Sequence, residues 1–175
     1  PPGNVGYFFD DIPVPLLFHA GAGPCVIPAG LVKRVELHLG AYPAELGRLA
    51  GAVVEADSTP PSDVWRGEGA FRTVDIGGLV EGPIGPGVTA LVGGHYSIGT
   101  KLVYALVKNI DIDYADYQGR LSMKTGPRGR FTLTTFGSYD YLATHDREAA
   151  PDGSGRAVDV PSVLVDSDFH RVDVR

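Results

Sequence analysis

The feature that most constrains this chain is the separation of charged and apolar side chains along a period of two. Between residues 115 and 124 the charged side chains fall on even positions, and the large apolar ones fall on odd positions. Successive side chains of a β-strand point to opposite faces, so this pattern predicts a strand with one polar and one apolar face. Similar patterns predict six strands, at about 64–72, 74–84, 88–98, 113–125, 130–142 and 168–175.

The connections between these segments differ in length. Gly85-Pro86-Gly87 and residues 126–129 predict tight turns, whereas 99–112 and 143–167 predict long loops. Short turns at one end and long loops at the other are typical of outer-membrane barrels. On this interpretation the loop carboxylates are solvated: Asp111, Asp113, Asp146 and Asp152. Aromatic residues would form girdles, with Trp65 and Phe131 near the short-turn ends and the others near the long loops: Tyr96, Tyr114, Tyr117, Tyr139 and Tyr141.

Composition excludes several classes of protein. The net charge of −6 leaves no basic stripe for phosphates, so we expect no nucleic-acid partner. No run of about 18 apolar residues predicts a transmembrane helix. The single cysteine, Cys25, rules out an internal disulfide framework and indicates a small buried residue whose role the sequence does not define.

The first sixty residues have a different character, and the composition changes at the Ser/Thr/Pro cluster of residues 58–62. Residues 6–14 predict a strand, and residues 28–33 predict a short helix, because proline suits a first helical turn. The alternation of residues 35–39 predicts a half-buried strand, and Val53-Val54 a last short one.

Three segments of this region resemble the C-terminal half of the plug domain of TonB-dependent receptors, in the order and spacing of that family. The first is Gly6 to Val14, which resembles a strand that ends in an Asp-Gly-x-Pro turn, with Asp11 in place of the glycine. The second joins Val26-Ile27-Pro28 to Leu31–Leu37, and the third runs from Gly40 to Val54. In the third, Leu46 replaces an aromatic residue and Ala52 a glycine.

The resemblance implies a mainly β protein: a fragment of a plugged transmembrane antiparallel β-barrel with a small α+β plug portion at its N-terminus. Residues 1–59 would be the C-terminal half of the plug, and residues 60–175 the first strands of a barrel of about 22 strands. The sequence starts at Pro1 without a leader and stops within an alternating pattern, as expected of an internal fragment. With one face toward lipid, Leu121→Arg should harm assembly and Arg120→Leu should be milder.

The family also implies a function. The protein would bind a scarce extracellular solute, such as a siderophore, cobalamin or a saccharide, and import it into the periplasm. TonB would act through a segment upstream of this chain, and the protein would sit among the lipids of a Gram-negative outer membrane. We expect neither a cofactor nor an enzymatic activity.

The candidate ligand-binding residues are Phe18, His19 and Gly21, which occupy the position of an apical plug loop. The alternative is that this loop packs against the barrel wall, and for His19 the two roles stay open. Asp10, Asp11 and Glu36 could also pair as carboxylates, and His19, His38 and His95 could act as ligands or bases. Because none of them falls in a catalytic or metal-binding spacing, we expect no catalytic and no metal site.

A second class of function is a secreted, soluble β-sandwich that binds a polymer or a partner, and a third is an outer-membrane adhesin or porin without a plug. A sandwich would close its sheets on themselves and bury apolar faces between them. The receptor instead predicts an open, curved sheet with unpaired edges.

Overall fold

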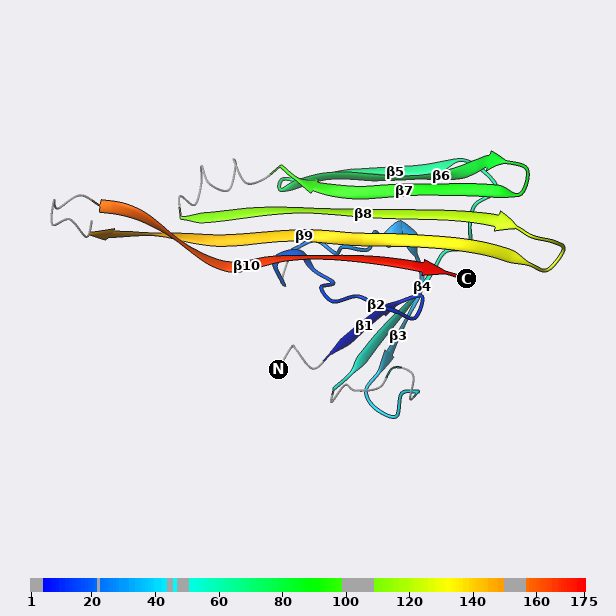
Figure 1. Ribbon diagram of the computed structural model, residues 1–175, viewed down its shortest axis with the longest axis horizontal. Helices are drawn as coiled ribbons and strands as arrows, with labels where there is room; N and C mark the ends of the chain where they lie inside the picture. The colour runs from blue at the N-terminus through cyan, green and yellow to red at the C-terminus, as the bar shows by residue number, and fades with distance from the viewer. Residues whose placement is uncertain (1–4, 22, 44–45, 47–50, 99–108, 150–156) are drawn as a thin grey trace.

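The computed structural model describes residues 5–21, 23–43, 46, 51–98, 109–149 and 157–175, which form two β-sheets. The larger is a six-stranded antiparallel sheet, and the smaller, built from the N-terminal residues, projects from one of its faces (Figure 1). Neither sheet closes on itself.

The smaller sheet has the order β2-β1-β4-β3. Its strands are β1 (Gly6–Phe9), β2 (Ile12–Pro13), β3 (Val32–His38) and β4 (Val53–Ser58). β1 and β4 are parallel, and the other two pairs are antiparallel. Two short 3-10 turns, η2 (His19–Gly21) and η3 (Ala29–Leu31), lie between β2 and β3.

The larger sheet follows the order of the sequence, from β5 at one edge to β10 at the other. Its strands are β5 (Arg66–Phe71), β6 (Asp75–Gly85), β7 (Val88–Ser97), β8 (Ile110–Lys124), β9 (Arg130–Ala149) and β10 (Ala157–Val174). The predicted six strands and both tight turns are therefore confirmed. Within the described residues, β5 and β10 each have one edge without a neighbour.

The larger sheet has the opposite sidedness to that of a soluble protein. On β8 the buried side chains are Tyr114 and the polar residues Asp116, Gln118, Arg120 and Ser122, whereas Leu121 and Met123 are exposed. Other strands add buried polar residues to the inner face: Asp75, Glu81, Thr89, His95, Ser97, Ser138 and Asp140. Their exposed apolar residues occupy the outer face: Phe71, Ile76, Val80, Val92, Tyr96, Phe131, Tyr139, Val172 and Val174. The N-terminal region covers the polar face and leaves the apolar face open.

Three apolar side chains interrupt the polar face and form the core with the N-terminal region. Leu79, Leu91 and Phe136 cluster with buried residues of the first part of the chain: Phe9, Ile12, Val14, Val26, Ile27 and Leu31. Phe9 and Phe136 meet edge to face, with 5.9 Å between ring centroids. The hydrophobic core therefore lies between the two sheets, as a small patch inside a polar interface.

The structure corrects several predictions for the N-terminal region. Residues 6–14 form a hairpin instead of one strand, because Asp10 and Asp11 make a two-residue turn with φ of 48° and 60°. Aspartate is one of the few non-glycine residues that accept this conformation, so Asp11 replaces glycine without loss of the turn. The predicted helix is only the 3-10 turn η3, and no α-helix occurs among the described residues. Val35 and Leu37 are exposed, so the strand predicted as half-buried has an open apolar face.

The predicted long loops are largely strand. β8 already begins at Ile110, so Asp111 and Asp113 belong to the sheet; residues 99–108 lie outside the described part. β9 continues to Ala149 and β10 starts at Ala157, so most of the predicted loop 143–167 is a paired ladder, which extends beyond β8 (Figure 1). Asp146 is therefore on β9, and Asp152 lies outside the described residues.

Of the seven residues of the predicted aromatic girdle, five are exposed, Tyr141 is half-buried and Tyr114 is buried. Trp65, Phe131, Tyr96, Tyr117 and Tyr139 are exposed. Tyr114 is only 4% exposed, and its hydroxyl donates to Asp75 Oδ2 over 2.9 Å. Its even position places it on the polar face, so its assignment to the girdle is wrong.

The expected mildness of Arg120→Leu is also not supported. Arg120 donates to Glu81 Oε1 over 2.5 Å and to the carbonyl oxygen of Thr59 over 2.6 Å. Its removal would leave buried polar groups without a partner, which is strongly destabilising.

None of the described helical segments is long and apolar enough to cross a membrane.

The sidedness of the larger sheet predicts the effect of a charge on its outer face. Val92 is 66% exposed and pairs with Gly119 in the middle of the apolar band. If this face meets lipid, Val92→Arg costs about 2–4 kcal/mol and lowers the amount of folded full-length protein in the membrane fraction. In a soluble protein the same exposed substitution would change stability by no more than about 0.5 kcal/mol.

The matched control is Val92→Ala, which shortens the same side chain without adding a charge. We expect its yield to stay near that of the parent protein. Equal yields of folded Val92→Arg and parent protein would contradict the assignment of this face to lipid.

Candidate functional site

The candidate site is the loop of residues 15–25, which the N-terminal region extends along the polar face of the larger sheet (Figure 1). The loop closes on itself through the backbone, since His19 N donates to Pro24 O over 3.0 Å and Val26 N to Leu17 O over 2.9 Å. Ala20 and Gly21 adopt left-handed conformations, with φ of 49° and 80°. These bonds fix the loop in a compact form with His19 directed toward β8 and β9.

His19 is the centre of the contact between the loop and the sheet. Its Nδ1 lies 2.9 Å from Asp140 Oδ1 on β9, and its Nε2 lies 2.9 Å from Asp116 Oδ2 on β8. All three side chains are fully buried. The backbone N–H of Ala20 also donates to Asp140 Oδ1 over 2.8 Å. We call this group, His19 with Asp116 and Asp140, the histidine clamp.

The geometry assigns the charge of the clamp. An ionised carboxylate only accepts hydrogen bonds, so both ring nitrogens of His19 must donate, and only the imidazolium has two N–H groups. Burial lowers the pKa of His19, but the hydrogen bonds that its ring donates to Asp116 and Asp140 outweigh this effect and raise the pKa to about 9. The clamp is therefore a cation held between two anions.

The surroundings of the clamp hold each member in place. Asp116 accepts further hydrogen bonds from the backbone and ring of His95 and from Gln118 Nε2. Ser138 Oγ donates to Asp140 Oδ2 over 3.1 Å. The Tyr114 ring stacks on the imidazole at 4.3 Å, a favourable position for a cation over an aromatic face.

Two further polar anchors join the N-terminal region to the sheet. Gln118 Nε2 donates to the carbonyl oxygen of Val26 over 2.6 Å. Arg120 binds the carbonyl oxygen of Thr59, at the start of the link between the two sheets, and Glu81 joins Arg120 to Arg66. The carbonyl oxygens of Val26 and Thr59 thus accept hydrogen bonds from side chains of the larger sheet. These bonds fix the position of the N-terminal backbone on the polar face.

The other end of the N-terminal region contacts β10. Arg171 Nε donates to the carbonyl oxygen of Pro13 over 3.1 Å. Arg175 pairs with Asp11 at 3.2 Å and binds the carbonyl oxygen of Asp10. The turn at Asp10-Asp11 therefore serves as a contact with the sheet.

The three predicted ligand-binding residues have different environments. Phe18 is 40% exposed, Gly21 is exposed, and His19 is fully buried with both ring nitrogens occupied. His19 packs against β8 and β9, and both of its ring nitrogens contact carboxylates in this arrangement. The ligand-binding role of the loop stays a prediction, for which Phe18 is the exposed large side chain.

Sequence reasoning missed the partners of His19. Asp116 and Asp140 were assigned to the polar face but looked like any other charged residue of a strand. The signal was present in their surroundings: Asp116 precedes Tyr117 and Asp140 lies between Tyr139 and Tyr141, each near the middle of its strand. Cys25 borders the apolar side of the small sheet, half-buried, and burial raises the pKa of its thiol, which suits a packing role.

The clamp predicts a large effect of His19→Gln. Glutamine is neutral, so the two buried carboxylates would be left without a positive charge between them. We expect a loss of about 3–5 kcal/mol in stability, measured as urea unfolding or as protease sensitivity of the N-terminal region in the full-length protein. His170→Gln, at an exposed histidine of β10, is the control and should leave stability within about 0.5 kcal/mol of the parent. An equal loss in both variants would contradict the clamp.

The clamp also predicts a pH dependence. The folded pKa of His19 lies above the ordinary value of 6.5, so its stabilisation is complete below about pH 6.5 and is lost as the pH rises through about 9. Melting temperatures of the parent protein should fall over this window, and those of His19→Gln should fall less. Parallel pH profiles would show that His19 does not carry a proton in the folded protein.

Comparison with known proteins gives a likeness of fold. No protein-family model matches the sequence, and no curated protein matches it. Among solved structures, a variant of the ferric enterobactin receptor of Pseudomonas aeruginosa, in complex with enterobactin, is similar with a TM-score of 0.52 and 17% sequence identity. The match covers 82% of this chain and 26% of the receptor chain. The chain thus spans about a quarter of the length of that receptor chain and is similar in fold to the matched part.

Proposed function

We propose that this chain is part of a TonB-dependent outer-membrane receptor that binds a scarce extracellular solute and imports it into the periplasm. Residues 1–59 are the C-terminal half of its plug, and residues 60–175 begin its barrel. The chain has a binding and transport role and no catalytic one. TonB acts on a segment upstream of this chain, and the outer membrane of a Gram-negative bacterium is the site of action.

The observation that carries this proposal is the sidedness of the six-stranded sheet. Its charged face is covered by protein, and its apolar face is open. A solvated sheet face would be polar, since exposing a broad apolar surface to water is unfavourable. A barrel strand in lipid has the observed pattern, with apolar residues outward and polar residues toward the lumen.

The dimensions of the outer face support the same conclusion. On β8 the outward positions of residues 115–123 carry no charge, and the charges Asp113 and Asp111 follow. This uncharged length matches the about 9–11 residues that a barrel strand needs to cross the bilayer. On the neighbouring strands β10 and β9, Asp166 and Asp168 pair with Tyr141 and Tyr139. Charged residues and tyrosines therefore occur together at the end of the uncharged segment. β9, with 20 residues, is about 60 Å long and extends well beyond it.

The soluble sandwich fits this arrangement poorly. A sandwich buries apolar faces between its sheets, whereas here a polar face meets the small sheet and the apolar face is left outside. The unpaired edges of β5 and β10 also favour a sheet that continues in further strands, because a long open edge promotes aggregation. A porin or adhesin without a plug would lack the N-terminal region that fills the polar side.

The proposal gives the polar interface a mechanical role in uptake. A plug that opens a path must release part of its contact with the wall, and polar anchors can exchange their partners for water. The apolar patch around Phe136 is small, so little apolar surface would be exposed if the plug shifted. The histidine clamp holds the loop of residues 15–25 against the larger sheet until the plug shifts.

The test measures energised uptake by the full-length protein. Candidate solutes are ferric siderophores, cobalamin and saccharides; the similar receptor, in its solved structure, holds enterobactin. We expect one of these to accumulate only in cells that have both this protein and a functional TonB. Uptake that is independent of TonB, or absence of the protein from the outer-membrane fraction, would contradict the proposal.

Phe18 is the first residue to change once a ligand is known. We expect Phe18→Ala to weaken ligand binding at least about fivefold, or about 1 kcal/mol, because exposed aromatic residues are frequent binding hot spots. Phe71→Ala is the matched control, since Phe71 is 79% exposed on the outer face of β5. Equal affinities of Phe18→Ala and the parent protein would exclude this loop position from the ligand site.

A further inference from the structure

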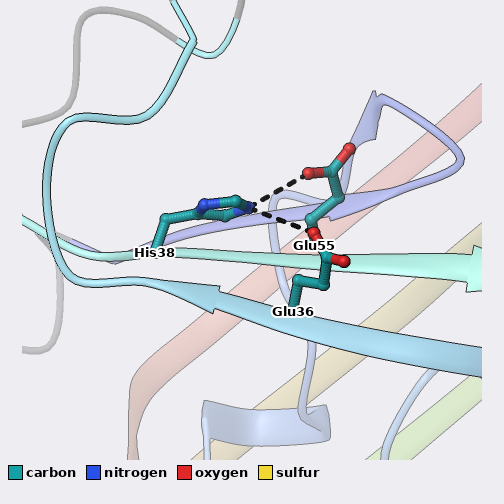
Figure 2. Close-up of side chains that lie close together, drawn as sticks. All are labelled: Glu36, His38 and Glu55. Atoms are coloured by element: carbon teal, nitrogen blue, oxygen red, sulfur yellow. Dashed lines mark hydrogen bonds and ion pairs between the residues drawn. The ribbon is translucent and has the colours of Figure 1, made fainter.

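A second cluster of chemically active side chains lies on the small sheet, away from the histidine clamp. Glu36 and His38 are two residues apart on β3, so they share a face, and Glu55 on β4 pairs directly with Glu36. Figure 2 shows the imidazole of His38 directed toward both carboxylates. One ligand atom from each residue lies within 4.8 Å of the other two.

We propose that Glu36, His38 and Glu55 bind a divalent transition-metal ion, with Zn²⁺ the best match for their donor set. One imidazole nitrogen and two carboxylate oxygens are ordinary zinc ligands, whereas Ca²⁺ and Mg²⁺ prefer oxygen alone. Three protein ligands leave a further position for water or for an external ligand.

The distances in the cluster are long for hydrogen bonds and close to those between ligands of one metal ion, although His38 Nε2 and Glu55 Oε2 are within hydrogen-bonding distance. His38 Nε2 lies 3.3 Å from Glu55 Oε2 and 3.8 Å from Glu36 Oε2, both longer than a strong charge-assisted hydrogen bond of about 2.7–2.9 Å. Two ligand atoms at about 2.0–2.2 Å from a tetrahedral Zn²⁺ are about 3.3–3.6 Å apart. The two distances from His38 Nε2 lie within or close to this range, and the three donor atoms all lie within 4.8 Å of one another.

The charges of this face are unbalanced without a cation. Glu36, Glu55 and Asp57 carry three negative charges, and Arg34 carries the one positive charge that pairs with them, which leaves a net charge of −2. Carboxylates directly opposite each other on neighbouring strands repel. One divalent ion would neutralise the face and relieve this repulsion.

Arg34 prepares the site without blocking it. Its Nη1 lies 2.7 Å from Glu36 Oε1, and its Nη2 lies 2.8 Å from Asp57 Oδ2. The other carboxylate oxygen of Glu36, Oε2, is the one that faces His38. Arg34 thus orients a ligand from outside the first coordination sphere, as hydrogen-bonded partners of metal ligands commonly do.

The cluster is accessible to an ion, and it joins two strands that are far apart in the sequence. His38, Glu36 and Glu55 are 27%, 42% and 23% exposed. Because the ligands come from β3 and β4, no short motif marks the site, and the sequence analysis expected no metal. Bound metal would link β3 to β4 and stabilise the small sheet.

The experiment is a calorimetric titration of metal-free full-length protein with Zn²⁺, repeated with a large excess of Mg²⁺. We expect one site per chain that Mg²⁺ does not occupy. His38→Gln should lower the affinity at least about 10- to 100-fold, since the loss of a mere outer-shell partner already costs that much. Zn²⁺ binding should also raise the melting temperature of the parent protein and not that of His38→Gln.

Two variants separate coordination from simple charge attraction. Glu55→Asp keeps the charge but withdraws the carboxylate by one methylene, so it should weaken coordination and not attraction. His170→Ala is the matched control, because His170 faces only one carboxylate, that of Asp168, at 3.6 Å. Its Zn²⁺ affinity should equal that of the parent protein.

Far-ultraviolet circular dichroism of each metal-free variant shows whether it is folded as the parent is. Failure of the parent to bind Zn²⁺, or binding that His38→Gln and Glu55→Asp leave unchanged, would overturn the proposal. Because the titration uses purified protein and no transport, its result is independent of the proposed uptake function.

Discussion

The structure depends on one constraint, which is that the charged face of the six-stranded sheet must be covered. Asp116, Gln118, Arg120 and Asp140 lie on that face and are almost inaccessible to solvent. Buried charges are tolerated only when each finds an opposite charge or a set of hydrogen bonds. The N-terminal region provides these partners through the imidazolium of His19 and the carbonyl oxygens of Val26 and Thr59. The small sheet, the loop and the link between the sheets are positioned by this requirement.

The same constraint explains the balance of forces between the two parts of the chain. The interface combines polar anchors with one apolar cluster, to which the larger sheet contributes Leu79, Leu91 and Phe136, with Phe169 packed against them. A polar interface is specific, because each donor needs its acceptor, but its groups can be satisfied by water as well. An interface of this kind suits a domain that is held firmly and still has to move. A fully apolar interface would resist separation in water far more strongly.

Particular residues show how far the sequence could be interpreted. The sidedness of β8 followed from alternation alone, because a strand has only two faces and the charged side chains between residues 115 and 124 all lie on one of them. Tyr114 was assigned to the wrong face, and Phe136 was overlooked as a core residue. An aromatic residue on the polar face has no local signal that distinguishes a core contact from an irregularity in the alternation. The part of the β9–β10 ladder that lies within residues 143–167 was also missed. Its composition of Asp, Gly, Pro and Ser is typical of loops, and only the pairing of the two strands with each other makes it extended.

The sequence by itself determined that six segments of the larger sheet form strands, that tight turns join some of them, and that charged and apolar side chains alternate between two faces. These properties depend on neighbours one or two positions away, and local stereochemistry is sufficient to specify them. Only the tertiary structure decided which face is covered, and that His19 meets Asp116 and Asp140, about a hundred residues away. It also decided that Glu36, His38 and Glu55 converge. Such groups come together through strand register and the packing of one sheet on another, and no short spacing in the sequence records either.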